Sequence, residues 1–385
     1  MSSEDSVKPL WIETPLIYSS YISDYLGCSV YLKLENVQTA QSFKYRGISR
    51  FIQKIKEKHG PSVHLLAASG GNAGFAAAVA ARALELNCTV YLPSIASEET
   101  RQLLRNQNAK VVVAGDVYSE TVAALQQALK NEPNAVFVPA YEDPALWEGH
   151  GSMIKEIKEQ LSEKPDAIFC NVGGGGLLGG IMGGCQAVGW DDVPVVAVET
   201  HGSNCFYHSI SLNTDKFADM SATQPQTDIP SANDIYDVKR DSEYSVNLAH
   251  IRKITSRASS LGASSAAPGV VRKALDRSGG IKCVCVSDEM AMYTAKAFGE
   301  DHKLIIELAC AATLTAAYNR ELFSHLVESG QPRQKTAKTI VFIVCGGIKV
   351  SFNELMEHHD LLKGIAESDE GWPISYNGQA FNVSK

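Results

Sequence analysis

The chain has 385 residues, of which 45% are hydrophobic and 20% are charged, and its formal net charge is -8. This length exceeds that of a typical single domain and predicts two packed lobes, and the composition is that of a folded protein rather than a disordered or fibrous one. Acidic and basic residues are interspersed, which argues against a nucleic-acid surface, because such a surface needs clustered basic residues to neutralise phosphates.

One lysine near the N-terminus has neighbours that suit a covalent catalyst. Lys44 follows Phe43 and precedes Tyr45, Arg46 and Gly47. An amine whose environment lowers its pKa can attack an aldehyde and form a Schiff base, and the ring of Phe43 could wall such a site. Most lysines are solvated surface charges, so this segment alone is also compatible with an ordinary surface role.

From residue 63 the sequence alternates between strand and helix patterns. The predicted strands cover residues 63–68, 88–93, 109–114 and 135–139, and the predicted helices cover 73–86, 97–106 and 119–132. This succession indicates βαβ units and a parallel sheet with helices on both faces. The small lobe that it forms is expected to end near Tyr141.

The turn after the first of these strands reads Ser69-Gly70-Gly71-Asn72-Ala73-Gly74. Its amides lie at the start of a helix, where a free carboxylate could bind, and the Ser69 hydroxyl and Asn72 amide could add hydrogen bonds. An N-cap in a tight turn explains the same residues without any ligand. The turn alone favours that structural interpretation.

A second series follows, and its elements are predicted as a helix over 145–161, a strand over 166–172, a helix ending near 188 and a strand over 194–199. Between its first strand and the next helix lies a glycine run that includes Gly173, Gly174, Gly175, Gly176 and Leu177. Converging backbone N–H groups and the helix dipole let such a turn hold a phosphate. A dinucleotide site and close helix packing are the alternatives.

The regular pattern breaks over residues 212–248, which are rich in Asp, Ser, Thr and Asn and contain Pro225 and Pro230. We expect an exposed excursion with a short helix. The later predictions are a strand over 282–287, helices over 288–300 and 307–319, and a strand over 339–344. The polar tail after about Gly364 is expected to be loose.

The sequence lacks the signals of secreted and membrane proteins. Its polar, acidic start has no secretory pattern, and no apolar run approaches the roughly 20 residues of a membrane span. The nine cysteines are scattered, often within apolar runs, as in a reducing compartment. Cys283 and Cys285 share one face of a predicted strand, and we interpret them as core residues rather than zinc ligands. We therefore expect a cytoplasmic protein.

Three motifs, in this order, carry a family resemblance: the segment 42–47 around Lys44, the turn 69–74, and the glycine run 173–177. Together they resemble pyridoxal-phosphate enzymes of the tryptophan synthase β fold. Within that superfamily the chain is most similar to the catabolic L-serine/L-threonine dehydratases, and the segments that match are 32–38, 147–150, 199–202 and 344–347. The resemblance covers about residues 10 to 360 and includes no C-terminal regulatory lobe.

This resemblance implies an α/β protein with the two-lobed architecture called pyridoxal-phosphate fold type II, each lobe a mostly parallel sheet flanked by helices. A large cofactor-binding domain would comprise residues 1–36 and 144–362. A small domain over 37–143 would carry the lysine and the substrate loop, and residues 363–385 would be a flexible tail. A homodimer is the expected assembly, and amino-acid catabolism and gluconeogenesis the expected context.

The resemblance also implies roles for individual residues. Lys44 would hold pyridoxal 5'-phosphate as a Schiff base, Phe43 would pack beside its ring, Asn72 would bond its phenolic oxygen, and Cys345 would face its ring nitrogen as a neutral partner. The phosphate would bind at Gly173, Gly174, Gly175, Gly176 and Leu177. The substrate carboxylate would bind at Ser69, Gly70, Gly71 and Asn72.

The implied reaction is a β-elimination of water from an amino acid. Lys44, once released from the cofactor, would remove the α-proton, and L-serine would give pyruvate and ammonia while L-threonine would give 2-oxobutyrate. A monovalent cation, K+, is a further expectation, with ligands at Gly173, Glu199, Ser203, Leu261 and Ala263. A glutamate at a strand end is otherwise a surface charge or a capping group.

The sequence departs from the dehydratase pattern at Leu308, where proline is usual, at Ile348-Lys349, where asparagines are common, and in the long excursion over 212–248. Other superfamily members share the lysine chemistry, namely cysteine desulfhydrases, threonine synthases and racemases. A non-catalytic α/β protein that binds a dinucleotide or another ligand would also have glycine turns. His150 and His201 lie in turns or at element ends, and the sequence assigns them no role.

Overall fold

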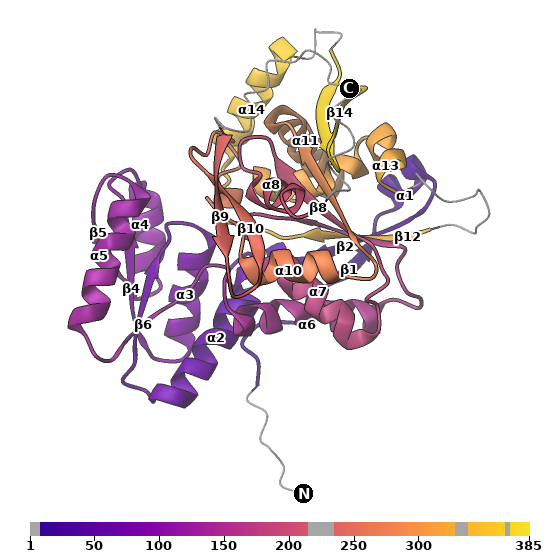
Figure 1. Ribbon diagram of the computed structural model, residues 1–385. Helices are drawn as coiled ribbons and strands as arrows, with labels where there is room; N and C mark the ends of the chain where they lie inside the picture. The colour runs from indigo at the N-terminus through magenta and orange to yellow at the C-terminus, as the bar shows by residue number, and fades with distance from the viewer. Residues whose placement is uncertain (1–7, 215–234, 328–337, 366–369) are drawn as a thin grey trace, which may run out of the picture.

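The computed structural model describes residues 8–214, 235–327, 338–365 and 370–385, and it has two lobes, each built around one sheet (Figure 1). The larger sheet has eight strands in the order β1-β2-β12-β7-β8-β11-β13-β14, and the smaller has four in the order β5-β4-β3-β6. Helix α2 (Lys44–His59) packs against α6 of the large lobe and α3 of the small one. The lysine is the first residue of this connecting helix.

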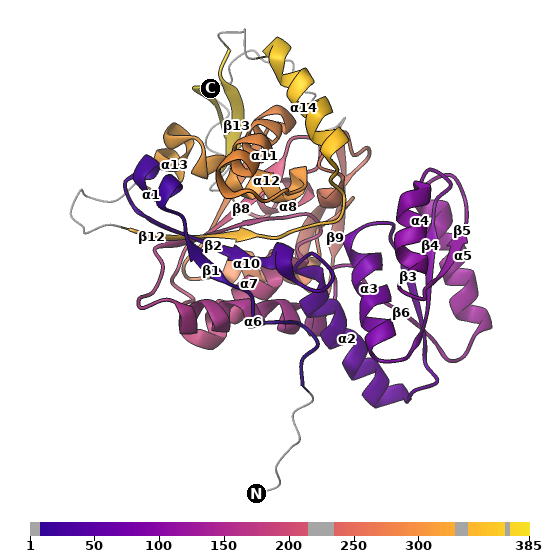
Figure 2. The ribbon, with the colours of Figure 1, turned by 180° about the vertical axis from the view of Figure 1, so that it is seen from behind.

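The small sheet is entirely parallel. Its strands are β3 (His64–Ala68), β4 (Asn87–Leu92), β5 (Lys110–Val113) and β6 (Ala135–Phe137), and its helices are α3 (Asn72–Ala83), α4 (Glu98–Arg105) and α5 (Tyr118–Asn131). Figures 1 and 2 show α3 and α5 on opposite faces of the sheet. Because both faces are covered, the central strand β3 is almost wholly apolar and buried.

Five parallel strands form the centre of the large sheet, namely β2 (Ser29–Leu34), β12 (Thr339–Val344), β7 (Ala167–Asn171), β8 (Val195–Thr200) and β11 (Ile281–Val286). Strand β1 (Leu16–Tyr18) is added antiparallel at one edge. All six residues of β12 are buried, since this strand lies inside the sheet. Helices α6 (Pro144–Gln160), α7 (Gly176–Val188) and α10 (Pro268–Asp276) lie on one face of the sheet (Figure 2).

The opposite face of this sheet is covered by α11 (Asp288–His302), α12 (Leu308–Leu314) and α13 (Arg320–Val327). The other helices of the described residues are α1 (Ser20–Leu26), α8 (Cys205–Ser211), α14 (Phe352–Ile365) and the one-turn helices Glu35–Val37, Ser259–Leu261 and Thr315–Ala317. The helix predicted over 307–319 is thus an α-helix only to Leu314 and continues as a single 3-10 turn. No helix in the described ranges is both long and apolar enough to cross a bilayer.

The C-terminal residues differ from the prediction of a loose tail over 363–385. Strands β13 (Trp372–Tyr376) and β14 (Gln379–Val383) form a hairpin, and β13 pairs antiparallel with β11. Trp372 and Ile374 are buried, and Asn377-Gly378 forms the turn with positive φ at both residues. The sequence did contain a signal for this hairpin, since the apolar residues Trp372 and Ile374 alternate with others before the Asn-Gly turn. The polar composition of the surrounding tail led to the wrong prediction.

The excursion predicted over 212–248 lies partly outside the described residues, at 215–234. Its later part is regular, because β9 (Tyr236–Asp241) and β10 (Val246–Ile251) form an antiparallel pair. Val246 and Ala249 are buried, and β10 packs against α8 and α10. The prediction of an exposed excursion is therefore wrong for residues 246–248, whose strand covers part of the large lobe.

Candidate active site

Lys44 lies at the junction of the two lobes. Its Nζ donates a hydrogen bond of 2.5 Å to the carbonyl oxygen of Ala140 and lies 5.2 Å from the centre of the Phe43 ring. Desolvation lowers the pKa of Lys44 from 10.5 to about 8, against favourable interactions with Cys345 and Glu307. The ion pairs among the described residues do not include Lys44. An enclosed amine without a carboxylate partner is suited to act in its neutral, nucleophilic form.

Two residues further along the same helix, Arg46 anchors α2 to the large lobe. Its Nε lies 2.6 Å from Glu35 Oε2, and its Nη1 lies 2.6 Å from Glu156 Oε1. Lys33 Nζ lies 2.6 Å from the other oxygen of Glu156, and the Thr14 hydroxyl donates to Glu35. We call these five buried residues the Arg46 cluster. The cluster fixes the start of α2 and with it the position of Lys44.

His150 supports the same helix start. Its Nδ1 accepts a hydrogen bond of 3.2 Å from the Gly47 N–H, and its ring packs 4.9 Å from that of Phe43. Burial, with nearby Lys44 and Arg46, holds the pKa of His150 well below 6.5. The neutral ring is therefore a structural acceptor for α2. His201 is also largely buried, which lowers its pKa.

The glycine run forms the turn between β7 and α7. Gly175 has a φ of 97°, and a Cβ on Gly174 would lie 2.4 Å from the Tyr141 ring. A Cβ on Gly173 would lie 3.0 Å from the carbonyl oxygen of Leu261. No side chain fits at these positions, so the loop presents bare backbone at a helix start. This is the kind of cradle that a phosphate needs.

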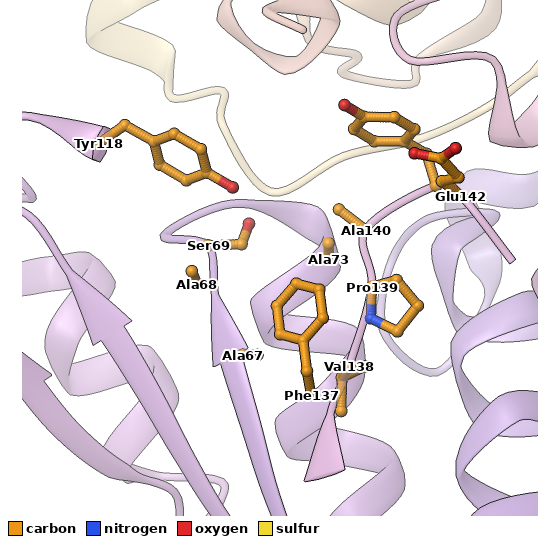
Figure 3. Close-up of a pocket in the computed structure, with 11 residues that line it drawn as sticks. Ala67, Ala68, Ser69, Ala73, Tyr118, Phe137, Val138, Pro139, Ala140 and Glu142 are labelled. Carbon is orange, nitrogen blue, oxygen red and sulfur yellow. The ribbon is translucent and has the colours of Figure 1, made fainter. Parts of the chain in front are cut away.

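The turn after β3 borders a cavity of about 220 Å³ at the carboxyl ends of β3 and β6 (Figure 3). The cavity is lined by Ala67, Ala68, Ser69, Ala73, Tyr118, Phe137, Val138, Pro139, Ala140, Tyr141 and Glu142. Ala140, whose carbonyl accepts from Lys44, is therefore part of its wall. The Ser69 hydroxyl accepts a hydrogen bond of 3.2 Å from the Gly71 N–H, so it shapes the turn itself. Carboxyl ends of parallel strands are where α/β proteins bind ligands.

Asn72 begins α3 and connects the two lobes. Its Nδ2 donates to Glu307 Oε1 at 2.9 Å, and its Oδ1 accepts from the Ile348 N–H at 2.8 Å. The second carboxylate oxygen of Glu307 accepts from the Lys349 N–H at 3.2 Å. Burial raises the pKa of Glu307 to about 7, against hydrogen bonds from Ser260 and Asn72. The Asn72 side chain is thus fixed from both sides, with one Nδ2 hydrogen left toward Ser260, 3.4 Å away.

Cys345 follows β12 and lies beside the start of α2. Its carbonyl oxygen accepts from the Phe43 N–H at 2.9 Å, and its Sγ accepts from Asn171 Nδ2 at 3.2 Å. Its contact with Cys310, together with burial, raises the pKa of Cys345 well above 9.0. The thiol is therefore neutral at physiological pH. Asn171, the last residue of β7, holds it in place.

The five residues expected around a cation form two groups: three residues whose backbones lie close together, and two residues with buried polar side chains. Gly173, Leu261 and Ala263 are contiguous, and the Ala263 N–H donates to the Leu261 carbonyl at 2.7 Å. The carboxylate of Glu199 accepts from the Phe206 and Tyr207 N–H groups at 3.0 and 2.6 Å. Burial raises the pKa of Glu199 well above 4.5. The Ser203 hydroxyl is buried without a hydrogen-bond partner in the described part of the chain.

The structure brings Lys44, Phe43, Asn72 and Cys345 to the junction of the lobes, and the glycine run contacts Tyr141, the neighbour of Ala140. Sequence reasoning missed several neighbours of these residues, namely Arg46, Ala140, Tyr141, Asn171 and Glu307. Ala140 acts through its carbonyl, which leaves no trace in a side-chain pattern. Glu307 had a sequence signal, since an acidic residue lies between two apolar pairs, Ile305-Ile306 and Leu308-Ala309.

Comparison with known proteins places these residues within one matched region. The model of the family described as "Pyridoxal-phosphate dependent enzyme" matches residues 7–346. Human L-serine dehydratase/L-threonine deaminase is 35% identical over 353 residues, 91% of this chain and 95% of that protein. L-serine dehydratase of Dictyostelium discoideum is 30% identical over 368 residues, 93% of each chain.

Solved structures give the same result for the fold. The fungal L-serine ammonia-lyase from Rhizomucor miehei superposes with a TM-score of 0.77 at 28% identity, covering 92% of this chain and 99% of that one. The processed threonine deaminase isoform 2 from Solanum lycopersicum superposes with a TM-score of 0.74 at 20% identity, covering 91% and 88%. The likeness to the second structure concerns the fold alone, and both superpositions extend over the two lobes.

Proposed function

This chain belongs to the pyridoxal-phosphate-dependent enzyme family and has its fold type II architecture, and we propose that it is an L-serine/L-threonine ammonia-lyase. It would convert L-serine to pyruvate and ammonia, and L-threonine to 2-oxobutyrate and ammonia. The observation that carries the proposal is the enclosed amine of Lys44, with a pKa of about 8 and no carboxylate partner among the described residues. The dehydratase names of relatives that match nine-tenths of the chain support the reaction type.

The residues at the junction fit pyridoxal phosphate. Lys44 would hold its aldehyde carbon, Phe43 would pack beside its ring, and Asn72 would bond its phenolic oxygen. The amides of residues 173–177 would hold its phosphate, because the four glycines of this run leave their backbone bare. When bound, the cofactor supplies an electron sink for the bond that breaks at the substrate's α-carbon.

Lys44 is also the proposed base. A base works best when its pKa is near the working pH, and desolvation has brought the pKa of this amine to about 8. The carbonyl of Ala140, a residue of the cavity wall, accepts a hydrogen bond from Nζ at 2.5 Å and orients the amine. In its neutral form Lys44 takes the proton from the α-carbon of the substrate.

The turn over residues 69–72 is the proposed site of the substrate carboxylate. The first amides of α3 have no intrahelical acceptor and point out of the helix start, where the dipole favours an anion. The Ser69 hydroxyl shapes the turn through the Gly71 N–H. The carboxylate would therefore lie between the start of α3 and the amine of Lys44.

Cys345 is the proposed partner of the cofactor's ring nitrogen. Its thiol is neutral, because contact with Cys310 and burial raise its pKa well above 9.0. With a neutral partner the ring nitrogen would stay unprotonated, and the ring would then withdraw electrons less strongly than a protonated ring. This favours elimination over reactions that need a long-lived carbanion.

A potassium ion is the second proposed ligand, with the carbonyl oxygens of Gly173, Leu261 and Ala263 and the side chains of Glu199 and Ser203 as its ligands. The Ser203 hydroxyl supports it, because it is buried and has no hydrogen-bond partner among the residues that the structure describes. The contact between Gly173 and Leu261 ties this site to the phosphate loop. Activity should be higher in potassium than in sodium buffer.

The experiment that tests the proposed function measures colour and product. The purified protein should absorb visible light, Lys44→Ala should abolish the absorption of the lysine-bound cofactor, and Lys54→Ala, an exposed lysine on the same helix, should keep it. L-serine and L-threonine should release 2-oxo acids. A colourless protein that pyridoxal phosphate leaves colourless contradicts the family chemistry, and release from L-cysteine alone assigns a desulfhydrase.

The homodimer, the cytoplasmic location and the role in amino-acid catabolism and gluconeogenesis stay predictions of the proposed function. Light scattering of the purified protein tests the first of them. Cell fractionation tests the second, and growth on L-serine as a carbon source tests the third.

A further inference from the structure

The segment that follows β12 crosses over the substrate turn. The Ile348 N–H donates to Asn72 Oδ1 at 2.8 Å, and the Lys349 N–H donates to Glu307 Oε2 at 3.2 Å. These two bonds fix the backbone of residues 348 and 349 against the start of α3. Ile348 and Lys349 are also the positions at which the sequence departs from the dehydratase pattern.

The Lys349 side chain lies directly against Gly71. A Cβ on Gly71 would lie 3.0 Å from Lys349 Cε and 3.5 Å from its Nζ. The missing side chain of Gly71 therefore makes room for the stem of Lys349. The turn that is proposed to hold the substrate carboxylate thus has an ammonium group at its second glycine.

The ammonium of Lys349 forms no ion pair in the described ranges, and its nearest anionic neighbour, Glu307, interacts with its charge without an ion-pair contact. The ion pairs among the described residues do not include it, and its Nζ makes one long hydrogen bond of 3.4 Å to the Ser259 hydroxyl. The nearby carboxyl of Glu307 is engaged by Asn72 and by the Lys349 backbone N–H rather than by Nζ. Lys349 is exposed to solvent, so a small anion that enters from outside can reach it.

We propose that Lys349 is a substrate-binding residue whose ammonium pairs with the α-carboxylate of the amino acid at the turn 69–72. The inference rests on the proposed function, which places the carboxylate there. Backbone amides offer partial charges, and Lys349 adds a full positive charge at the same place. This charge selects amino acids with a free carboxylate over their amides and esters.

The test uses the holoenzyme and ligands that cannot undergo elimination. L-alanine has the amine and the carboxylate but no β-hydroxyl, and L-alaninamide lacks the carboxylate charge. Each is titrated against the change in visible absorption of the wild type, Lys349→Met, Lys349→Arg and the control Lys363→Met. Lys363 is an exposed lysine of α14 that pairs with Asp360.

Lys349→Met should weaken L-alanine binding about ten-fold, should leave L-alaninamide binding within about two-fold, and should lose most of the salt dependence of L-alanine binding. Lys349→Arg should restore most of the affinity, and Lys363→Met should match the wild type. Equal losses for both ligands, or unchanged L-alanine binding, overturn the proposal. The salt dependence of the wild type provides the same test without any variant. As the KCl concentration rises, the binding of L-alanine should weaken and the binding of L-alaninamide should not.

These outcomes are distinct from a failure of the proposed function. If L-serine and L-threonine release no 2-oxo acid but L-alanine still binds more weakly to Lys349→Met, the reaction type is wrong and the role of Lys349 holds. If 2-oxo acid is released and Lys349→Met binds L-alanine as the wild type does, the reaction type holds and the role of Lys349 is wrong.

Discussion

The first turn of α2 carries two basic residues with different surroundings: Arg46 has carboxylate partners, and Lys44 does not. In the Arg46 cluster, the guanidinium bonds two carboxylates, Glu35 and Glu156, and Lys33 bonds the second of these as well. At the junction of the lobes, the hydrogen bond of the Lys44 amine within the described ranges goes to the carbonyl of Ala140 and to no carboxylate. The two cations are two residues apart on one helix.

Because of this difference in partners, Arg46 contributes to stability and Lys44 is available for reaction. Carboxylate partners raise the pKa of Arg46, so its charge is permanent and links α2 to α6 and to the one-turn helix that follows β2. Burial without such a partner lowers the pKa of Lys44 to about 8, so its amine gives up its proton near physiological pH. The buried anions differ in a related way: Glu35 forms an ion pair with Arg46, whereas Glu307 forms no ion pair among the described residues and accepts hydrogen bonds from Asn72 and the Lys349 N–H.

Arg46→Met should have the largest effect on stability. It leaves the buried carboxylate of Glu35 without a cation, and removing one partner of a buried ion pair costs about 3 to 5 kcal/mol. Urea unfolding of the cofactor-free protein at pH 7 measures this loss. A change below about 1 kcal/mol would show that the cluster does not stabilise α2.

Lys44→Met should stabilise the cofactor-free protein at pH 7. The pKa of Lys44 is about 8 in the fold and 10.5 when the chain is unfolded, so the unfolded state binds more protons between these values. The wild type should therefore gain stability as pH rises from 8 to 10.5, and below 8 it should be roughly 3 kcal/mol less stable than a neutral equivalent. The free energies of unfolding of both proteins, measured from pH 7 to 10, give this difference in stability. If the difference does not become smaller as pH rises, Lys44 is solvated.

Glu307→Gln should change the pH dependence of stability in the opposite sense. Burial raises the pKa of Glu307 from 4.5 to about 7, so the folded state binds more protons between these values and loses stability as pH rises. The wild type should lose about 2 kcal/mol between pH 5 and 7 that the variant does not lose. Parallel pH profiles for the two proteins would rule out a titrating Glu307.

Arg50→Met should have the smallest effect and provides the baseline for Arg46. Arg50 lies one turn further along α2 and pairs with Glu148, whose side chain is half exposed. An exposed pair of this kind contributes less than about 1 kcal/mol, and salt screens it. Urea unfolding at low and high salt measures it, and a loss as large as that of Arg46→Met would remove the distinction between the two arginines.

Local patterns predicted most of the elements of this chain. The alternation after residue 63 gives β3, α3, β4, α4, β5, α5 and β6 with boundaries shifted by a few residues, because buried parallel strands are continuous apolar runs and helices have their own period. The hairpin β13–β14 was missed, since its strands are short and its stability comes from pairing with β11. The Asn-Gly turn at 377–378 was a local signal for the hairpin, but the pairing of β13 with β11 joins residues 90 apart and cannot be derived from a local pattern.

The residues of the candidate site also fall into two groups, those in local sequence motifs and those supplied by distant segments. Lys44, the turns 69–74 and 173–177 and Cys345 belong to contiguous motifs, so the sequence predicts the family, the fold class and the cofactor, and the comparisons confirm these three. The partners of these residues come from distant segments. Ala140, Glu307 and Lys349 reach the site because the segment after β6, the start of α12 and the segment after β12 meet at the same junction.

The sequence by itself determined the chemistry available to this protein, because a lysine, two bare glycine turns and a cysteine after an apolar strand are each encoded within a few residues. Only the tertiary structure decided how each charge behaves. Whether a buried cation becomes a permanent anchor, as Arg46 does, or a titratable amine, as Lys44 does, depends on which carboxylates the fold brings within a few ångströms. That distance is set by packing between segments more than 100 residues apart, as with Arg46 and Glu156.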